Sequence, residues 1–317
     1  MASKKHHISS YELAEHLNDS LDLLKHELQA LRGNTNTDEL NDIEHNIVQQ
    51  LEHLKRDASI LTNQPIRTIH HLACTGGTLI SKCIAALPNV QLLSEVDPLS
   101  TLQDSGKPMF GPTDLIKQWR QGSRGASQDD IIELFLAEMK VILNAATRVG
   151  QNVVIRDHSH SHFNSGPEIP ERPTIRQILQ RTFDVKSVVT VRHPADSYAS
   201  MVKKNWHTHF QPSDFDEYCS RYLSFLESYS SSISIKYENF VKSPSEIMNK
   251  IATELELDFS ETYLSTFPAI MLTGDSGRTQ TTLTEHEPRK EAITLRNEYE
   301  DSAVYKKLCS KLSYDIV

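Results

Sequence analysis

A predicted strand, a glycine-containing turn and a predicted helix follow one another at residues 66–87, and this stretch constrains the fold of the 317-residue chain most strongly. A β-branched run begins at Ile66, the turn spans residues 74–78 (CTGGT), and helical apolar spacing follows. Such a turn directs backbone N–H groups and a helix N-terminus towards an anion, and Gly76 and Gly77 allow close approach of the backbone. The stretch therefore predicts an anion site, with a purely structural turn as the alternative.

Short apolar runs alternate with helical patterns from residue 66 onward. Residues 152–156 (NVVIR) and 186–191 (KSVVTV) contain short apolar runs and no alternation, as in the central strands of a parallel sheet, and residues 232–237 predict a further strand. Helices are predicted at residues 129–147, 195–204, 215–229, 244–255 and 297–312. This order predicts an α/β domain over residues 66–317, with a three-layer, P-loop-type fold and a largely parallel central sheet.

The first 60 residues carry a different pattern. Leucines recur at spacings of three and four residues between Leu17 and Leu31, and a second apolar stripe runs from Leu40 to Leu54. This pattern predicts two amphipathic helices that form an N-terminal hairpin ahead of the α/β domain. Packing against that domain and coiled-coil self-association into a homo-oligomer both remain open.

Composition excludes several classes of protein. The formal net charge of −9 argues against a general nucleic-acid-binding protein, which needs a basic surface. No apolar run is long enough to span a bilayer, and the N-terminal sequence lacks the apolar core of a signal peptide. The four cysteines are widely spaced, as expected for reduced thiols in a cytoplasmic protein.

Polar side chains follow three of the predicted strands. The first strand ends in the glycine turn, the second in Arg156 and a histidine-rich segment at residues 157–162, and the third in Arg192. Ligands of open α/β sheets bind beyond the carboxyl ends of the strands, so these residues are expected to converge on one site.

Five short motifs, in order along residues 66–283, resemble those of sulfotransferases that use 3′-phosphoadenosine 5′-phosphosulfate (PAPS). The pair Gly77-Thr78 is similar to the family's 5′-phosphosulfate motif. A strand that ends in Arg192, followed eight residues later by Ser200, resembles its 3′-phosphate motif. The remaining three motifs are Arg156-Asp157-His158, Tyr237-Glu238-Asn239 and residues 274–278.

The resemblance implies a PAPS-dependent sulfotransferase that transfers a sulfuryl group in line, without a metal, to a hydroxyl or amine acceptor. His158 would be the general base, because an imidazole can take a proton near neutral pH. The acceptor would be a small molecule, a lipid or a saccharide. The residues implied in PAPS binding are Thr75, Gly76, Gly77, Thr78, Leu79, Arg192, Ser200 and Arg278.

One position departs from the family pattern. Many members carry a lysine two positions before the glycine of the first motif, where Thr75 stands here. Either Lys82, one helical turn after Thr78, or Arg156 would then supply the catalytic cation.

Two other functions remain as alternatives. A P-loop kinase would require the G-x-x-x-x-G-K-[ST] pattern, which the turn lacks. A non-catalytic interaction protein with a degenerate nucleotide fold would account for the missing lysine. His158, His160 and His162 would share one face of an extended segment and could bind a metal there, but companion ligands are few and no metal site is predicted.

Overall fold

The computed structural model describes residues 64–102, 111–274, 283–284 and 287–316. The predicted N-terminal hairpin lies outside these residues, so the hairpin and its coiled coil stay predictions. Two compact units are distinguished, residues 1–65 with 139–151, and residues 66–138 with 152–317. The second unit contains the sheet and every candidate site residue that the structure describes.

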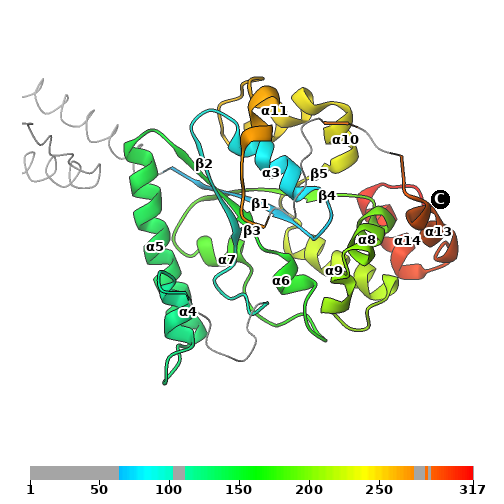
Figure 1. The fold of residues 1–317 in the computed structure, drawn as a ribbon, viewed down its shortest axis with the longest axis horizontal. Helices are drawn as coiled ribbons and strands as arrows, with labels where there is room; N and C mark the ends of the chain where they lie inside the picture. Colours follow the sequence, from blue (N-terminus) through cyan, green and yellow to red (C-terminus); the bar gives the residue numbers. More distant parts are fainter. Residues whose placement is uncertain (1–63, 103–110, 275–282, 285–286, 317) are drawn as a thin grey trace, which may run out of the picture. The chain divides into compact units, whose positions relative to one another are not determined.

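Five parallel strands form the sheet, in the order β2-β3-β1-β4-β5 (Figure 1). The strands are β1 (Ile66–His71), β2 (Val90–Val96), β3 (Asn152–Asp157), β4 (Val185–Val191) and β5 (Ile233–Lys236). The predicted parallel sheet is confirmed. Every residue of β1 is buried, as expected for the central strand.

Helices cover both faces of the sheet within the second unit (Figure 1). One apolar cluster joins the sheet to α3 (Gly77–Ala85), α10 (Tyr237–Lys242), α11 (Pro244–Glu254), α12 (Tyr263–Thr266) and η2 (Phe267–Ala269). The other joins it to α6 (His160–Phe163), α8 (Pro194–Lys203), α9 (Phe215–Ser228), α13 (Lys290–Glu298) and α14 (Ala303–Leu312). The remaining elements are α4 (Leu115–Arg120), α5 (Gln128–Arg148), α7 (Ile175–Leu179) and η1 (Trp206–His209).

The structure departs from the predicted helices and strands in several places. The closing helix predicted at residues 297–312 begins only at Ala303 (α14), because Ser302 caps it by accepting a hydrogen bond from the Tyr305 N–H, and residues 297–298 are the end of α13. The strand predicted at residues 232–237 ends at Lys236, and Tyr237 already begins α10. The predicted extended segment of three histidines is wrong, since α6 begins at His160.

Among the described residues, none of the helices combines the length and the apolar character that crossing a bilayer requires.

Candidate active site

The turn between β1 and α3 has the geometry of an anion cradle. Gly76 is the N-cap of α3, with φ of 89°, and it has no side chain to cap the first helical turn. The N–H groups at a helix start have no intrahelical partner, so those of Gly77 and Thr78 can bind an anion. The Leu79 N–H donates instead to Gly76 O at 3.1 Å, and the Leu79 side chain lies in the core.

Both glycines are required by their neighbours. A Cβ on Gly76 would lie 2.2 Å from the Tyr237 ring, and a Cβ on Gly77 would lie 2.2 Å from the His71 ring. Tyr237, whose motif the sequence singled out, therefore packs directly against the turn. The two aromatic side chains occupy the space that any larger residue would need.

Gly76→Ala is expected to destabilise the protein. Positive φ costs a residue with a Cβ about 1–2 kcal/mol, and the overlap with the Tyr237 ring adds about 1–3 kcal/mol. Gly166→Ala is the matched control, because Gly166 has φ of 76° but its added Cβ would meet nothing closer than Glu168 O at 3.7 Å. Urea denaturation of both variants should show the larger loss for Gly76→Ala, and equal losses would contradict this account.

Arg156, at the end of β3, connects the turn to two other segments. Its Nη2 donates to Thr78 Oγ1 at 2.8 Å and lies 2.7 Å from Glu95 Oε1. Its Nε donates to His71 Nε2 at 2.9 Å. Burial and then the Arg156 charge lower the pKa of His71 to about 3, so this imidazole is a neutral acceptor. Arg156 thus places a buried positive charge beside the first turn of α3.

Glu95 is the acidic partner of this arginine and was not singled out from the sequence. It has φ of 59°, in the left-handed region that a non-glycine residue rarely adopts. Burial raises the pKa of its carboxyl to about 7, although the Arg156 charge acts in the opposite direction. Its Oε2 is buried and has no hydrogen-bond partner among the described residues. A carboxyl of this kind can exchange a proton near neutral pH.

A loop from the C-terminal half of the chain packs over this pair. Ser94 Oγ donates to Thr273 O at 2.9 Å, Thr273 Oγ1 donates back to Ser94 O at 3.0 Å, and Arg156 Nη1 donates to Thr273 O at 3.3 Å. A Cβ on Gly274 would lie 2.4 Å from the Glu95 side chain. The predicted glycine loop therefore begins at the site, while Arg278 lies outside the described residues.

His158 lies two residues beyond Arg156, and its Nε2 is 3.5 Å from Glu95 Oε2. Burial, more than any other effect, lowers the pKa of His158. Asp157, between Arg156 and His158, accepts hydrogen bonds from His70 at 2.7 Å, Ser159 at 2.6 Å and Tyr229 at 2.8 Å. Burial alone would raise the pKa of Asp157, but these donors outweigh it and hold the pKa below its usual value. The buried carboxylate thereby fixes the segment that carries His158.

Arg192, at the end of β4, reaches the same turn from the other side. Its Nη1 donates to Cys74 O at 3.4 Å, and its guanidinium lies over the Tyr237 ring, 5.1 Å from the centroid. Ser200 lies in α8 and is 2% exposed, and its Oγ has no hydrogen-bond partner within the described part of the chain. Because buried hydroxyls are normally paired, an unpaired Ser200 is consistent with a bound ligand that supplies the partner.

Two of the other predicted site residues have less direct positions. Thr75 is fully buried and its hydroxyl donates to Leu72 O at 2.8 Å, so only its backbone remains to contact a ligand. Lys82 lies half-buried in α3, and its role as a catalytic cation stays a prediction. Arg156 is the cation that the described contacts place at Thr78.

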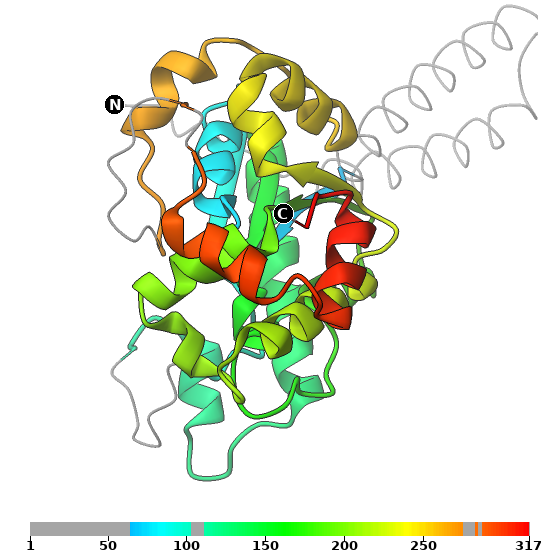
Figure 2. The same ribbon diagram turned by 90° about the vertical axis from the view of Figure 1, so that its right-hand side faces the viewer.

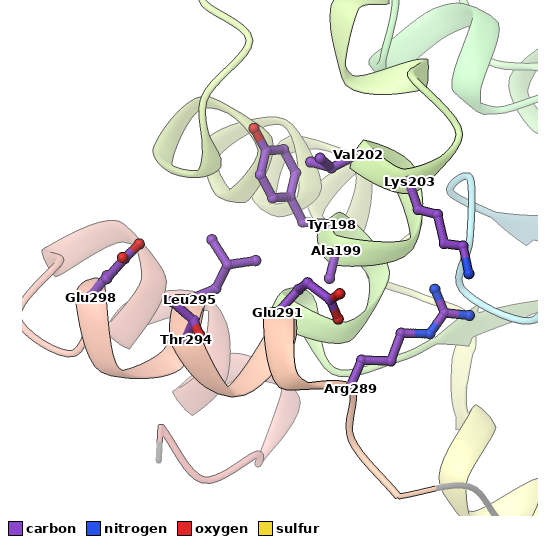
Figure 3. A pocket seen from close by; sticks show the side chains of 9 residues that line it. All are labelled: Tyr198, Ala199, Val202, Lys203, Arg289, Glu291, Thr294, Leu295 and Glu298. Atoms are coloured by element: carbon purple, nitrogen blue, oxygen red, sulfur yellow. The ribbon is translucent and has the colours of Figure 1, made fainter.

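A pocket of about 800 Å³ lies between α8 and α13, which pack side by side (Figure 2). Lys203 of α8 and Arg289 at the start of α13 extend towards one another at one end of it, and Tyr198 and Leu295 contribute apolar surface (Figure 3). Glu291 and Glu298 line the same pocket, so its charged lining is mixed.

Glu95 could have been found from the sequence. In the sequence, residues 90–93 (VQLL) form a short apolar run that ends before Ser94 and Glu95, whereas β2 continues to Val96 beyond a β-bulge. Counting β2 among the strands that end in polar residues would have placed Glu95 at the carboxyl edge of the sheet with Arg156.

Comparisons with known proteins found no matching family model and no matching curated protein. Solved structures of several sulfotransferases match across most of the chain. The sulfotransferase domain of the Synechococcus PCC 7002 olefin synthase has 17% identity and a TM-score of 0.47, over 80% of this chain and 96% of that one. The Alicyclobacillus acidocaldarius sulfotransferase has 14% identity and a TM-score of 0.42, over 79% and 96%. Mouse sulfotransferase SULT7A1, solved with PAP, has 13% identity and a TM-score of 0.38, over 78% and 89%. At these values the function has to be inferred from the residues of the site.

Proposed function

We propose that this protein is a PAPS-dependent sulfotransferase. The observation that carries the proposal is the Arg156 guanidinium, which joins the hydroxyl of Thr78 in the anion cradle to the carboxylate of Glu95. An anion site, a buried cation and a proton acceptor are thus in contiguous contact. These are the groups that transfer of a charged group from a phosphate leaving group to a hydroxyl requires.

Two features of the chain fit the donor nucleotide. The Gly76-Gly77 turn offers N–H groups to a 5′-phosphate, and the Ser200 hydroxyl lacks a partner in the described structure. Arg192, in contact with the turn through Cys74 O, supplies a second positive charge for a 3′-phosphate. When bound, PAPS supplies the sulfuryl group that is transferred.

Arg156 and the amides of Gly77 and Thr78 stabilise negative charge that develops on the donor side. This stabilisation is strong because Arg156 is 2% exposed and therefore screened little by water. Its hydrogen bonds to His71 and Thr78 hold the guanidinium in place before substrate binds. In this way Arg156 supplies the positive charge that a lysine at position 75 would provide.

Glu95 and His158 together act as the base that removes the proton from the acceptor hydroxyl or amine. Glu95 Oε2 has an unused lone pair, and His158 Nε2 lies 3.5 Å from it on the more exposed side, with 17% of its side chain accessible. The acceptor hydroxyl or amine would approach from this side. Its identity as a small molecule, lipid or saccharide follows from the resemblance alone.

Ligand-induced stabilisation tests the proposal. Adenosine 3′,5′-bisphosphate in the presence of a chelator is expected to raise the melting temperature of the full chain, because a ligand stabilises the state that binds it. Stabilisation by ATP with Mg²⁺ alone would favour the kinase, and no response to either nucleotide would favour the non-catalytic protein. Release of adenosine 3′,5′-bisphosphate from PAPS, dependent on a candidate acceptor, then measures the activity.

Arg192→Ala is expected to weaken the binding of adenosine 3′,5′-bisphosphate by about 10–100-fold, since a hydrogen bond to a charged group contributes about 1.5–3 kcal/mol. Titration calorimetry on the variant measures this loss. Arg176→Ala is the control, because Arg176 donates to Ser231 at an exposed position that the site does not use. Equal affinities of Arg192→Ala and the unaltered chain would remove Arg192 from the nucleotide site.

A further inference from the structure

Three side chains with metal-binding atoms meet at the carboxyl edge of the sheet. Glu95 comes from the end of β2, His158 follows β3, and His160 is the first residue of α6. One ligand atom from each lies within 4.8 Å of the others. The two imidazole rings are in contact, with centroids 3.9 Å apart.

Two of these side chains have a buried polar atom without a partner in the described structure. These atoms are Glu95 Oε2 and His160 Nδ1. The other carboxylate oxygen, Oε1, is taken by Arg156 at 2.7 Å. Since buried polar atoms are nearly always paired, two unpaired atoms in one cluster are what a site that binds a ligand would show.

The spacing and the ligand types agree with a zinc ion. Zinc binds imidazole nitrogen and carboxylate oxygen at about 2.0–2.2 Å, which places tetrahedral ligand atoms about 3.3–3.6 Å apart. Glu95 Oε2 and His158 Nε2 are already 3.5 Å apart. A ligand atom of His160 lies within 4.8 Å of both, so the cluster offers two nitrogens and one oxygen, with a fourth position open.

We propose that Glu95, His158 and His160 form a Zn²⁺ site, with Arg156 holding the second oxygen of the carboxylate. A carboxylate shared between a metal and an outer hydrogen-bond donor is a common arrangement in metal sites. His162, the third histidine of the alternating pattern, is not part of this site. His162 Nε2 lies 3.1 Å from Pro170 O, and its ring stacks on Phe163.

The position of the site has a consequence for catalysis that rests on the proposed function. A zinc ion on Glu95 Oε2 and His158 Nε2 would occupy the lone pairs that take the proton of the acceptor. Bound Zn²⁺ is therefore an inhibitor of sulfuryl transfer, and a chelator restores activity.

Zinc binding is measured on the full chain by competition with a chromogenic chelator, without nucleotide. His160→Ala and His160→Gln are each expected to lower the affinity for one Zn²⁺ equivalent by at least about 100-fold. Loss of an outer-shell partner costs up to about 100-fold, and loss of a direct ligand should cost at least as much. His162→Ala is the matched control and should keep that equivalent. Melting curves of the metal-free variants verify that each is folded.

The proposal is overturned if the unaltered chain binds no Zn²⁺ equivalent that both His160 variants lose, or if His162→Ala loses it equally. Stabilisation by adenosine 3′,5′-bisphosphate in chelator is a separate measurement. It reports on the nucleotide site alone, so failure of the zinc site and failure of the proposed function are distinguished.

Discussion

Glu95→Gln is expected to lower the turnover of sulfuryl transfer by about 10²–10⁴-fold, the range that a positioned general base contributes. The amide keeps the size of the side chain and can still accept a hydrogen bond from Arg156, but it cannot take a proton. Affinity for adenosine 3′,5′-bisphosphate should stay close to that of the unaltered chain, since neither nucleotide phosphate is assigned to Glu95. Acceptor-dependent release of adenosine 3′,5′-bisphosphate from PAPS in chelator, together with calorimetric titration of the nucleotide, separates these two effects.

Asp97→Asn is the control for this variant. Asp97 directly follows β2, two residues after Glu95, but its carboxylate accepts hydrogen bonds from Arg172 at 3.0 and 2.7 Å and has a structural role. Its replacement should lower the melting temperature, and its effect on turnover per folded molecule should be much smaller than that of Glu95→Gln, because its charge acts on His158 only from a distance. If Glu95→Gln retains turnover and His158→Gln abolishes it, the base is His158 alone and the role given to Glu95 is wrong.

The elements of the fold that the sequence predicts best are those whose pattern is local. The apolar runs that became β3 and β4 predict buried parallel strands without any knowledge of their neighbours. The start of α14 depends on a single N-cap residue, Ser302, and the apolar periodicity of the sequence does not predict it. The conformation of the histidine segment was mispredicted because the helix α6 is only one turn long.

The candidate site was predicted only in part, because only some of its residues follow from local sequence patterns. The rule that ligands bind at the carboxyl edge of a parallel sheet predicts one common site for Arg156, Arg192 and the glycine turn. The contact between Glu95 and Gly274 joins positions 179 residues apart and is set by a β-bulge and a positive φ, neither of which leaves a clear sequence signal. Strain of this kind is frequent at functional sites.

Thr75→Lys would place a lysine where many PAPS-dependent sulfotransferases are expected to carry one, and it is expected to destabilise the protein. Thr75 is 0% exposed, and its hydroxyl donates to Leu72 O inside the turn. A lysine there has no acidic partner assigned to it and would introduce a second positive charge into a turn that Arg156 already contacts. An uncompensated buried charge costs about 3–5 kcal/mol.

Thr75→Val separates the charge from the loss of the hydroxyl. Valine keeps the shape of threonine and removes one hydrogen bond, so its cost should be about 1 kcal/mol. Urea denaturation of both variants in chelator measures the difference, which is expected to favour the valine variant by several kcal/mol. A stable Thr75→Lys variant with raised turnover would show that the lysine reaches the donor and that Arg156 does not replace it, whereas a destabilised variant supports Arg156 as the cation of the site.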